Sequence, residues 1–277
     1  MINLTFLFED APEYIVPPEQ HCPIININGD NLIFRCMKPS LNNPDEKRPA
    51  ILFLHGFPGN ENFRDLAQAF RRCGFVVCII FFRGVWGSGG VYRLSQLSDD
   101  AAVVIDYMKA HSDEMHVDPE RIYVIGHSMG GFAAMGLLSR GIDIKGAVLL
   151  APCDIVKMYT QSRADFDLLN QNAEPYFNLG EGVDRTVFCD EINNNIEKWA
   201  FSSMCSSMRK DLPILFVGAS RDVTCPPDIH IEPSYEYLKN NGFNVEKMIL
   251  DSDHCFQSVR IALTRTVAEW LNRKEVI

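Results

Sequence analysis

The sequence predicts an α/β protein, with a mostly parallel sheet, helices on both faces and an inserted helical cap. Three observations lead to this class. From residue 50 onward, short apolar runs alternate with amphipathic stretches, the order expected when crossover helices bury both faces of parallel strands. One long interval, residues 153–211, contains no convincing buried strand. The composition, 47% hydrophobic and 22% charged among 277 residues, is that of a globular protein and excludes a wholly disordered chain.

A β-hairpin is the first regular feature predicted along the chain. The proline-rich stretch before it, residues 12–23, is expected to be irregular. Residues 24–28 and 32–38 then flank Asn28-Gly29-Asp30. Because Asn and Gly tolerate the positive φ of a tight hairpin turn, these two stretches are predicted to pair.

Six buried strands are predicted after the hairpin. They span residues 50–55, 75–81, 121–126, 145–150, 213–218 and 245–250. Helices are predicted at residues 63–70, 97–108 and 259–270, because apolar residues recur there every three or four positions.

Residues 153–211 are predicted to form a cap inserted into a core domain made of residues 1–152 and 212–277. These 59 residues are far more than one crossover helix needs. Seven of the 59 are aromatic, close to the 10% of the whole chain, so composition does not distinguish a substrate pocket from plain helix packing.

Charge and cysteine content exclude several partners. Lys plus Arg is 26 and Asp plus Glu is 36, and the net charge of −10 repels phosphate backbones and anionic lipid, so neither nucleic acid nor a membrane is expected. The nine cysteines are irregularly spaced without C-x-x-C, which predicts reduced thiols in the cytoplasm rather than a disulfide scaffold or a metal site. The apolar residues 1–8 are too few for a signal peptide or a membrane span.

The strongest chemical motif is Gly126-His127-Ser128-Met129-Gly130, a G-x-S-x-G directly after an apolar run. Between a buried strand and a helix, this motif is typical of a nucleophile elbow. Its glycines let the strand and the helix approach closely while the serine hydroxyl projects at the carboxyl edge of the sheet. Ser128 is therefore the candidate nucleophile.

A serine nucleophile needs a base and an orienting carboxylate, and in this architecture the acid and then the histidine follow the serine along the chain. Asp222 follows one predicted strand and His254 follows the next, so both fall at the edge where Ser128 lies. Asp154, after the strand at residues 145–150, is the weaker rival for the acid.

Six other histidines fit the role of base less well. His127 belongs to the elbow and is expected to point away from the serine, and His55 is expected to be structural. The rest lie in polar or loop contexts and are expected at the surface: His21, His111, His116 and His230.

The loop His55-Gly56-Phe57-Pro58-Gly59 follows the first strand of the crossover series. Ester hydrolysis develops negative charge on the carbonyl oxygen, which two fixed backbone N–H groups can stabilise. Met129, directly after the nucleophile, supplies one by position, and Phe57 is the candidate for the second.

These motifs resemble the α/β-hydrolase family from about residue 24 to residue 271. The resemblance is closest to the bacterial branch that includes cinnamoyl/feruloyl-type esterases and the catalytic domains of prolyl-oligopeptidase-like peptidases. It implies an eight-stranded, mostly parallel sheet and an assembly of Ser128, His254 and Asp222. The oligopeptidases also carry a large N-terminal propeller, and only 49 residues precede Ala50, which favours an esterase.

The predicted function is a serine hydrolase that cleaves small-molecule carboxylic esters through an acyl-enzyme. Ser128 is the nucleophile, His254 the base, Asp222 the orienting acid, and the amides of Phe57 and Met129 hold the oxyanion. This chemistry requires no metal or organic cofactor. Two alternatives stay open: an exo-acting serine peptidase or amidase with the same residues, and a hydrolase-shaped binding protein without catalysis.

Overall fold

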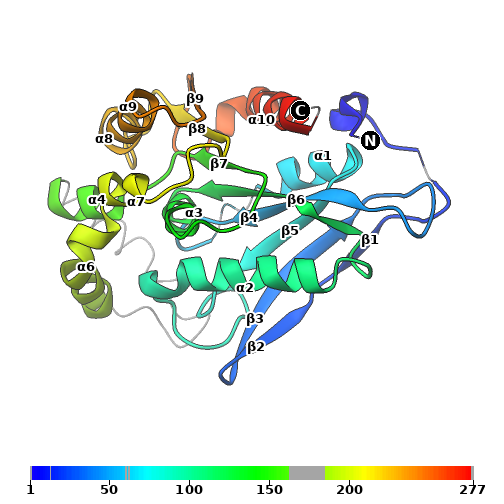
Figure 1. Ribbon diagram of the computed structural model, residues 1–277, viewed down its shortest axis with the longest axis horizontal. Helices are drawn as coiled ribbons and strands as arrows, with labels where there is room; N and C mark the ends of the chain where they lie inside the picture. Colours follow the sequence, from blue (N-terminus) through cyan, green and yellow to red (C-terminus); the bar gives the residue numbers. More distant parts are fainter. Residues whose placement is uncertain (1, 13, 60, 62, 162–184, 276–277) are drawn as a thin grey trace.

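The computed structural model describes residues 2–12, 14–59, 61, 63–161 and 185–275 (Figure 1). Its strands are β1 (Glu19–His21), β2 (Ile24–Ile27), β3 (Asp30–Lys38), β4 (Arg48–Leu54), β5 (Val76–Phe81), β6 (Val117–His127), β7 (Gly146–Leu150), β8 (Ile214–Ala219) and β9 (Val245–Leu250). Its α-helices are α1 (Arg64–Arg72), α2 (Leu97–Ala110), α3 (Met129–Ser139), α4 (Ile155–Gln161), α6 (Arg185–Trp199), α7 (Phe201–Ser206), α8 (Pro227–His230), α9 (Glu232–Asn240) and α10 (Arg260–Glu275). Three 3₁₀ turns are η1 (Leu4–Leu7), η2 (Leu94–Gln96) and η3 (Gln257–Val259).

All the strands join one sheet in the order β1-β3-β5-β4-β6-β7-β8-β9, with β2 paired to β3 beside β1. From β5 to β9 every pairing is parallel, and the pairings of β3 are antiparallel. β1 and β2 continue one register along β3 and are separated at Cys22-Pro23, so they fill one edge position of the sheet. The predicted mostly parallel sheet is confirmed, with its first strand split in two.

The hairpin turn is made by Asn28 and Gly29, with φ of 53° and 101°. Ile27 and Asp30 pair across it, which is the two-residue turn that both residues favour. β6 begins at Val117, earlier than predicted, because Val117 pairs with Arg48 across a register shift.

Two apolar cores cover the two faces of the sheet. Along β4, Leu52 belongs to the core under α2 and α3, while its neighbours Ile51 and Phe53 belong to the core under α1 and α10. This alternation follows from the two-residue period of a strand. Figure 1 shows α2 and α3 on one side of the sheet, and η1 near the N-terminus contacting α10 near the C-terminus. Helices therefore lie on both faces, as predicted.

The segment predicted as a cap contributes α4, α6 and α7; α6 contacts both α4 and α7, and α7 packs against α3. Residues 162–184 of this segment lie outside the described residues. The division into a core domain and a cap stays a prediction.

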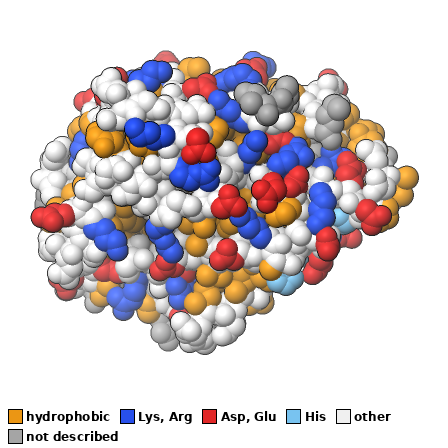
Figure 2. Space-filling model, in the orientation of Figure 1, with side chains coloured by type: hydrophobic (Ala, Val, Ile, Leu, Met, Phe, Trp, Pro, Cys, Tyr) orange, Lys and Arg blue, Asp and Glu red, His pale blue; other side chains and the backbone are white. Residues whose placement is uncertain are grey.

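On the face in Figure 2, acidic and basic side chains are interspersed, so the net charge of −10 is not gathered there. Within the described ranges, no helix is both long enough and apolar enough to cross a membrane.

Candidate active site

Ser128 stands alone between the end of β6 at His127 and the start of α3 at Met129, with φ 53° and ψ −116°. A non-glycine residue in this region is strained, by about 1–3 kcal/mol, and is kept there only by its surroundings. Any side chain at Gly126 would overlap the carbonyl of Gly130, and any side chain at Gly130 would overlap the carbonyl of Leu54. The two glycines of the motif are therefore required for strand and helix to meet around the serine.

Ser128, His254 and Asp222 lie in one hydrogen-bonded line. The Ser128 Oγ is 2.9 Å from His254 Nε2, and His254 Nδ1 is 2.7 Å from Asp222 Oδ2. Because a carboxylate only accepts, Nδ1 carries the proton that it donates to Asp222, and Nε2 is left to accept from the serine hydroxyl. The structure thus brings together the three side chains that the sequence singled out.

Asp222 is held rigidly in the turn after β8. Its Oδ1 accepts hydrogen bonds from the amides of Thr224 and Cys225, at 2.9 and 2.8 Å, and its carboxylate is fully buried. Both oxygens of the acid are therefore satisfied, one by backbone and one by the imidazole. His254 remains partly exposed to solvent.

His127 supports His254 in a way that the sequence analysis missed. Its Nε2 is 3.0 Å from the carbonyl oxygen of His254, to which it donates, and the two rings lie 4.9 Å apart. Phe63 packs against the His127 ring in a T-shaped arrangement, with the ring centroids 4.8 Å apart. Burial lowers the pKa of His127 well below its usual value, so the ring is neutral and acts as a fixed donor.

The loop after β4 runs directly beside the nucleophile. A Cβ on Gly56 would lie 3.1 Å from the Ser128 Cβ. His55 fixes the loop: its Nδ1 donates to the Gly56 carbonyl at 2.6 Å, its Nε2 accepts from the Phe82 amide at 3.4 Å, and burial lowers its pKa to about 4. His55 is structural, as expected.

Met129 is the first residue of α3, where a backbone N–H has no acceptor within the helix. Phe57 follows Gly56 in the loop beside Ser128, so the two predicted oxyanion donors belong to segments that meet at the serine.

Aromatic side chains form one wall near this loop. The Phe57 ring lies 5.2 Å from that of Tyr92 and 5.4 Å from that of Phe188 on α6. The Tyr92 hydroxyl is buried and has no hydrogen-bond partner in the described part of the chain. Glu191 anchors α6 to η2 by accepting from the Leu94 amide at 2.9 Å. Sequence reasoning did not find this cluster, because its members are far apart along the chain.

His230 corrects one expectation, because it is buried rather than at the surface. Its Nδ1 accepts a hydrogen bond from the amide of Asp154 at 3.0 Å, and burial lowers its pKa to about 4. α8 carries this ring inward, a direction that the surrounding polar sequence did not indicate.

Asp154, the rival acid, faces helix ends instead of an imidazole. Its Oδ1 accepts from the Lys157 amide at 3.1 Å, in the first turn of α4, and its carboxylate also bonds to the amides of Val156 and Phe201. Burial raises the pKa of this carboxyl.

One group of potential metal ligands lies next to the site: Cys153, Cys225 and His230, all buried, with ligand atoms within 4.8 Å of one another. The Nδ1 lone pair of His230 is already committed to the Asp154 amide, so Nε2 carries the ring proton. A metal-bound histidine normally donates through its other ring nitrogen. With the Nδ1 of His230 bonded to the Asp154 amide and its Nε2 protonated, the ring offers no free nitrogen lone pair, so the group does not fit a metal.

A family model described as "Serine aminopeptidase, S33" matches residues 45–178. Among curated proteins, a probable dipeptidyl-aminopeptidase B of Coccidioides posadasii is 23% identical over 285 residues, covering 96% of this chain and 28% of that protein. The chain spans about a third of the length of the curated relatives it matches.

Solved structures show the same fold. Apo esterase 2 of Thermogutta terrifontis superposes with a TM-score of 0.70 at 19% identity, covering 95% of this chain and 96% of that one. The acylaminoacyl peptidase of Pyrococcus horikoshii superposes with a TM-score of 0.71 at 19% identity, covering 94% of this chain and 42% of that one. The chain has the α/β-hydrolase fold, and these findings together support a serine hydrolase of the α/β-hydrolase type.

Proposed function

We propose that the protein is a carboxylic ester hydrolase that works through an acyl-enzyme on Ser128. The observation that carries the proposal is the pair of hydrogen bonds, 2.7 and 2.9 Å, that links Asp222 through His254 to the serine hydroxyl. A serine hydroxyl at neutral pH is a poor nucleophile without such a base.

In the first half of the reaction, Ser128 Oγ attacks the ester carbonyl and His254 Nε2 takes its proton. The amides of Met129 and Phe57 stabilise the oxyanion, and Asp222 stabilises the imidazolium. The C–O bond of the ester then breaks, and His254 returns the proton to the departing alcohol. Water repeats the cycle on the acyl-enzyme and releases the carboxylic acid, with no metal or organic cofactor in either half.

An aromatic acyl group, as in cinnamoyl or feruloyl esters, is the finer form of this proposal. Phe57, which is partly exposed, would pack against such a ring near the oxyanion loop, and the buried rings of Tyr92 and Phe188 support it from behind. A small-molecule ester is the proposed partner, and a cytoplasmic location stays a prediction from the cysteines.

An exo-acting serine peptidase or amidase is the second candidate. The serine aminopeptidase family model and the dipeptidyl-aminopeptidase relative favour it. The likeness to an esterase over nearly the whole of both chains supports the first candidate. Comparing aminoacyl anilides with esters of the same acyl group separates the two, and faster turnover of the anilides would replace the first proposal by the second.

Ser128→Ala tests the nucleophile. We expect it to lower kcat for short-chain and cinnamoyl aryl esters by a factor on the order of 10⁶, because the alternative nucleophile is unactivated water. Loss of labelling by a fluorophosphonate probe should accompany it, while circular dichroism shows a folded protein. Retained turnover or labelling would contradict the assignment, and a wild-type protein that the probe does not label would indicate a binding protein instead.

A further inference from the structure

A groove of about 650 Å³ lies on the α1 face of the sheet and contains two arginines and two aromatic side chains. Arg35 comes from β3, Phe81 from the end of β5, Arg64 from the start of α1 and Trp86 from the loop after β5. Gly59, at the end of the loop that begins beside Ser128, also lines the groove, together with Cys22 and Ile33. In the described part of the chain, no acidic side chain lines this groove.

Neither arginine pairs with an acidic side chain among the described residues, in a protein whose net charge is −10. The Nε of Arg35 is buried with no hydrogen-bond acceptor in that part of the chain. The Arg35 guanidinium lies 6.0 Å from the centre of the Phe81 ring, and Arg64 is exposed. A buried donor that lacks an acceptor lowers the stability of the fold by about 1–3 kcal/mol. An anionic group bound in the groove would supply acceptors to this guanidinium, which donates strong hydrogen bonds to such groups.

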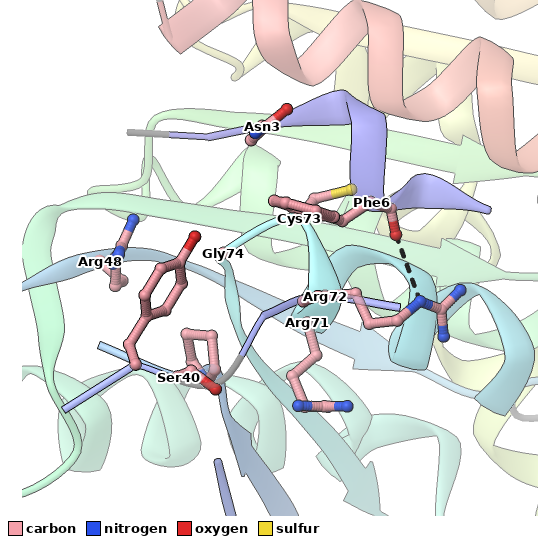
Figure 3. Close-up of a pocket in the computed structure, with 11 residues that line it drawn as sticks. Asn3, Phe6, Ser40, Arg48, Arg71, Arg72, Cys73 and Gly74 are labelled. Atoms are coloured by element: carbon pink, nitrogen blue, oxygen red, sulfur yellow. Dashed lines mark hydrogen bonds between the residues drawn. The ribbon is translucent and has the colours of Figure 1, made fainter. Parts of the chain in front are cut away.

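Two other arginines illustrate a structural role, one bonded to backbone carbonyls and one paired with a carboxylate. In the small pocket of Figure 3, the Arg72 Nε donates to the Phe6 carbonyl at 3.2 Å and its Nη2 donates to the Leu7 carbonyl at 2.9 Å, which fastens the N-terminal turn to α1. Arg48, which lines the same pocket, pairs with Glu46 at 2.8 Å. Within residues 2–12, 14–59, 61, 63–161 and 185–275, neither groove arginine has a comparable hydrogen bond or ion pair.

Trp86 places an indole at the mouth of the groove, half exposed and with φ of 53°. A bulky residue in this region is strained, and the hydrogen bond from Trp86 Nε1 to the Pro58 carbonyl, at 2.9 Å, holds it there. A side chain at Gly59 would overlap this indole. The same short loop therefore contacts Ser128 at Gly56 and Trp86 at Gly59. These two glycines are three residues apart, so their Cα atoms are separated by at most about 11 Å.

We propose that this groove is a substrate subsite for a carboxylate carried on an aromatic or alkyl arm, held by Arg35 and Arg64 against Trp86 and Phe81. Guanidinium groups bind carboxylates bidentately, and the aromatic faces cover the arm that carries the charge. The inference rests on the proposed ester hydrolysis and narrows its substrates to anionic esters. The carboxylate belongs either to the acyl group or to the alcohol, and these two sources need separate tests.

Two matched ester pairs make the test. For the acyl side, the 4-nitrophenyl monoester of adipic acid is compared with 4-nitrophenyl hexanoate. For the alcohol side, the butyrate ester of 3-(4-hydroxyphenyl)propanoate is compared with that of 3-(4-hydroxyphenyl)propanamide. In one of the two pairs we expect kcat/KM at low salt to favour the anionic ester by about 10-fold or more, a preference that falls as ionic strength rises.

In the double variant Arg35→Gln, Arg64→Gln, the ratio of kcat/KM for the anionic ester to kcat/KM for the neutral ester should be close to one. Arg64→Gln alone, at an exposed position, should lower this ratio part of the way. Arg140→Gln is the matched control, since it removes the same charge at a surface pair with Asp99 and should keep the ratio. A ratio of one or below in both pairs of the wild-type protein, or a ratio that the double variant keeps, would overturn the subsite.

Failure of the proposed function looks different, because the neutral esters would then not be hydrolysed either. In that case binding to the groove is still measured by the quenching of tryptophan fluorescence with 3-(4-hydroxyphenyl)propanoate. Saturable quenching that the double variant weakens by about 10-fold supports the subsite, and quenching equal in both proteins overturns it.

Discussion

Two aspartate–histidine pairs lie at the ends of the neighbouring strands β7 and β8. Asp222 bonds through its side chain to His254, at 2.7 Å, and that imidazole reaches Ser128. Asp154 bonds through its backbone amide to His230, at 3.0 Å, while its carboxylate binds the amides at the starts of α4 and α7. Residue types, burial of the acids and the sheet edge at which the acids lie are alike, whereas the bonding and the exposure of the imidazole differ.

The comparison teaches that an acid at the correct edge of the sheet is not sufficient. An orienting acid must present its carboxylate to the ring nitrogen opposite the serine. The Asp154 carboxylate instead accepts hydrogen bonds from amides at helix N-termini, where the helix dipole places partial positive charge. The first pair is therefore suited to catalysis, and the second pair to holding α4 and α8 in place.

Among variants of the two aspartate–histidine pairs, the largest effect is expected from Asp222→Asn. The amide can no longer fix the proton on Nδ1 of His254, so we expect kcat to fall by about 10⁴-fold with little change in fold. Steady-state kinetics with an aryl ester measures this, and near-normal turnover would remove Asp222 from the mechanism.

A smaller effect is expected on stability against acid. Burial lowers the pKa of His230 to about 4 in the folded protein, against an ordinary value of 6.5. Between these two values the unfolded chain binds a proton that the folded chain does not, so this contribution to stability is complete above pH 6.5 and is lost as the pH falls toward 4.

His230→Asn keeps an acceptor near the Asp154 amide and removes this titration. For both proteins, urea titration gives the loss in free energy of unfolding between pH 7 and pH 5. We expect this loss to be about 2 kcal/mol smaller for the variant than for the wild-type protein. Equal losses in both proteins would show that His230 does not stay neutral when folded.

The smallest effect is expected from Asp154→Asn, the same chemical change as the one at Asp222. Asparagine also caps helices, so we expect a stability cost of about 1 kcal/mol or less and kcat/KM within about threefold of the wild-type value. A fall in kcat approaching that of Asp222→Asn would instead give the two acids equal roles.

The sequence was sufficient for features whose signals are local. The hairpin at Asn28-Gly29, the buried parallel strands β4 to β8 and the glycines around Ser128 all depend on backbone geometry that neighbouring residues dictate. The prediction that β9 is buried was wrong, because β9 is the last strand of the sheet and most of its residues are exposed or half-buried. The split of the first strand at Cys22-Pro23 has a local cause as well, since proline donates no hydrogen bond, but the prediction placed this stretch outside the sheet.

What the sequence by itself determined is the order of the elements along the chain and the sheet edge at which Ser128, Asp222 and His254 fall. Only the tertiary structure decided which aspartate turns its carboxylate toward an imidazole, that His230 lies inside, and that Arg35 and Arg64 meet Trp86 in one groove. The reason is physical: strand and turn geometry is set by residues close in the chain, whereas the direction of a side chain is set by packing against segments that are tens of positions or more away.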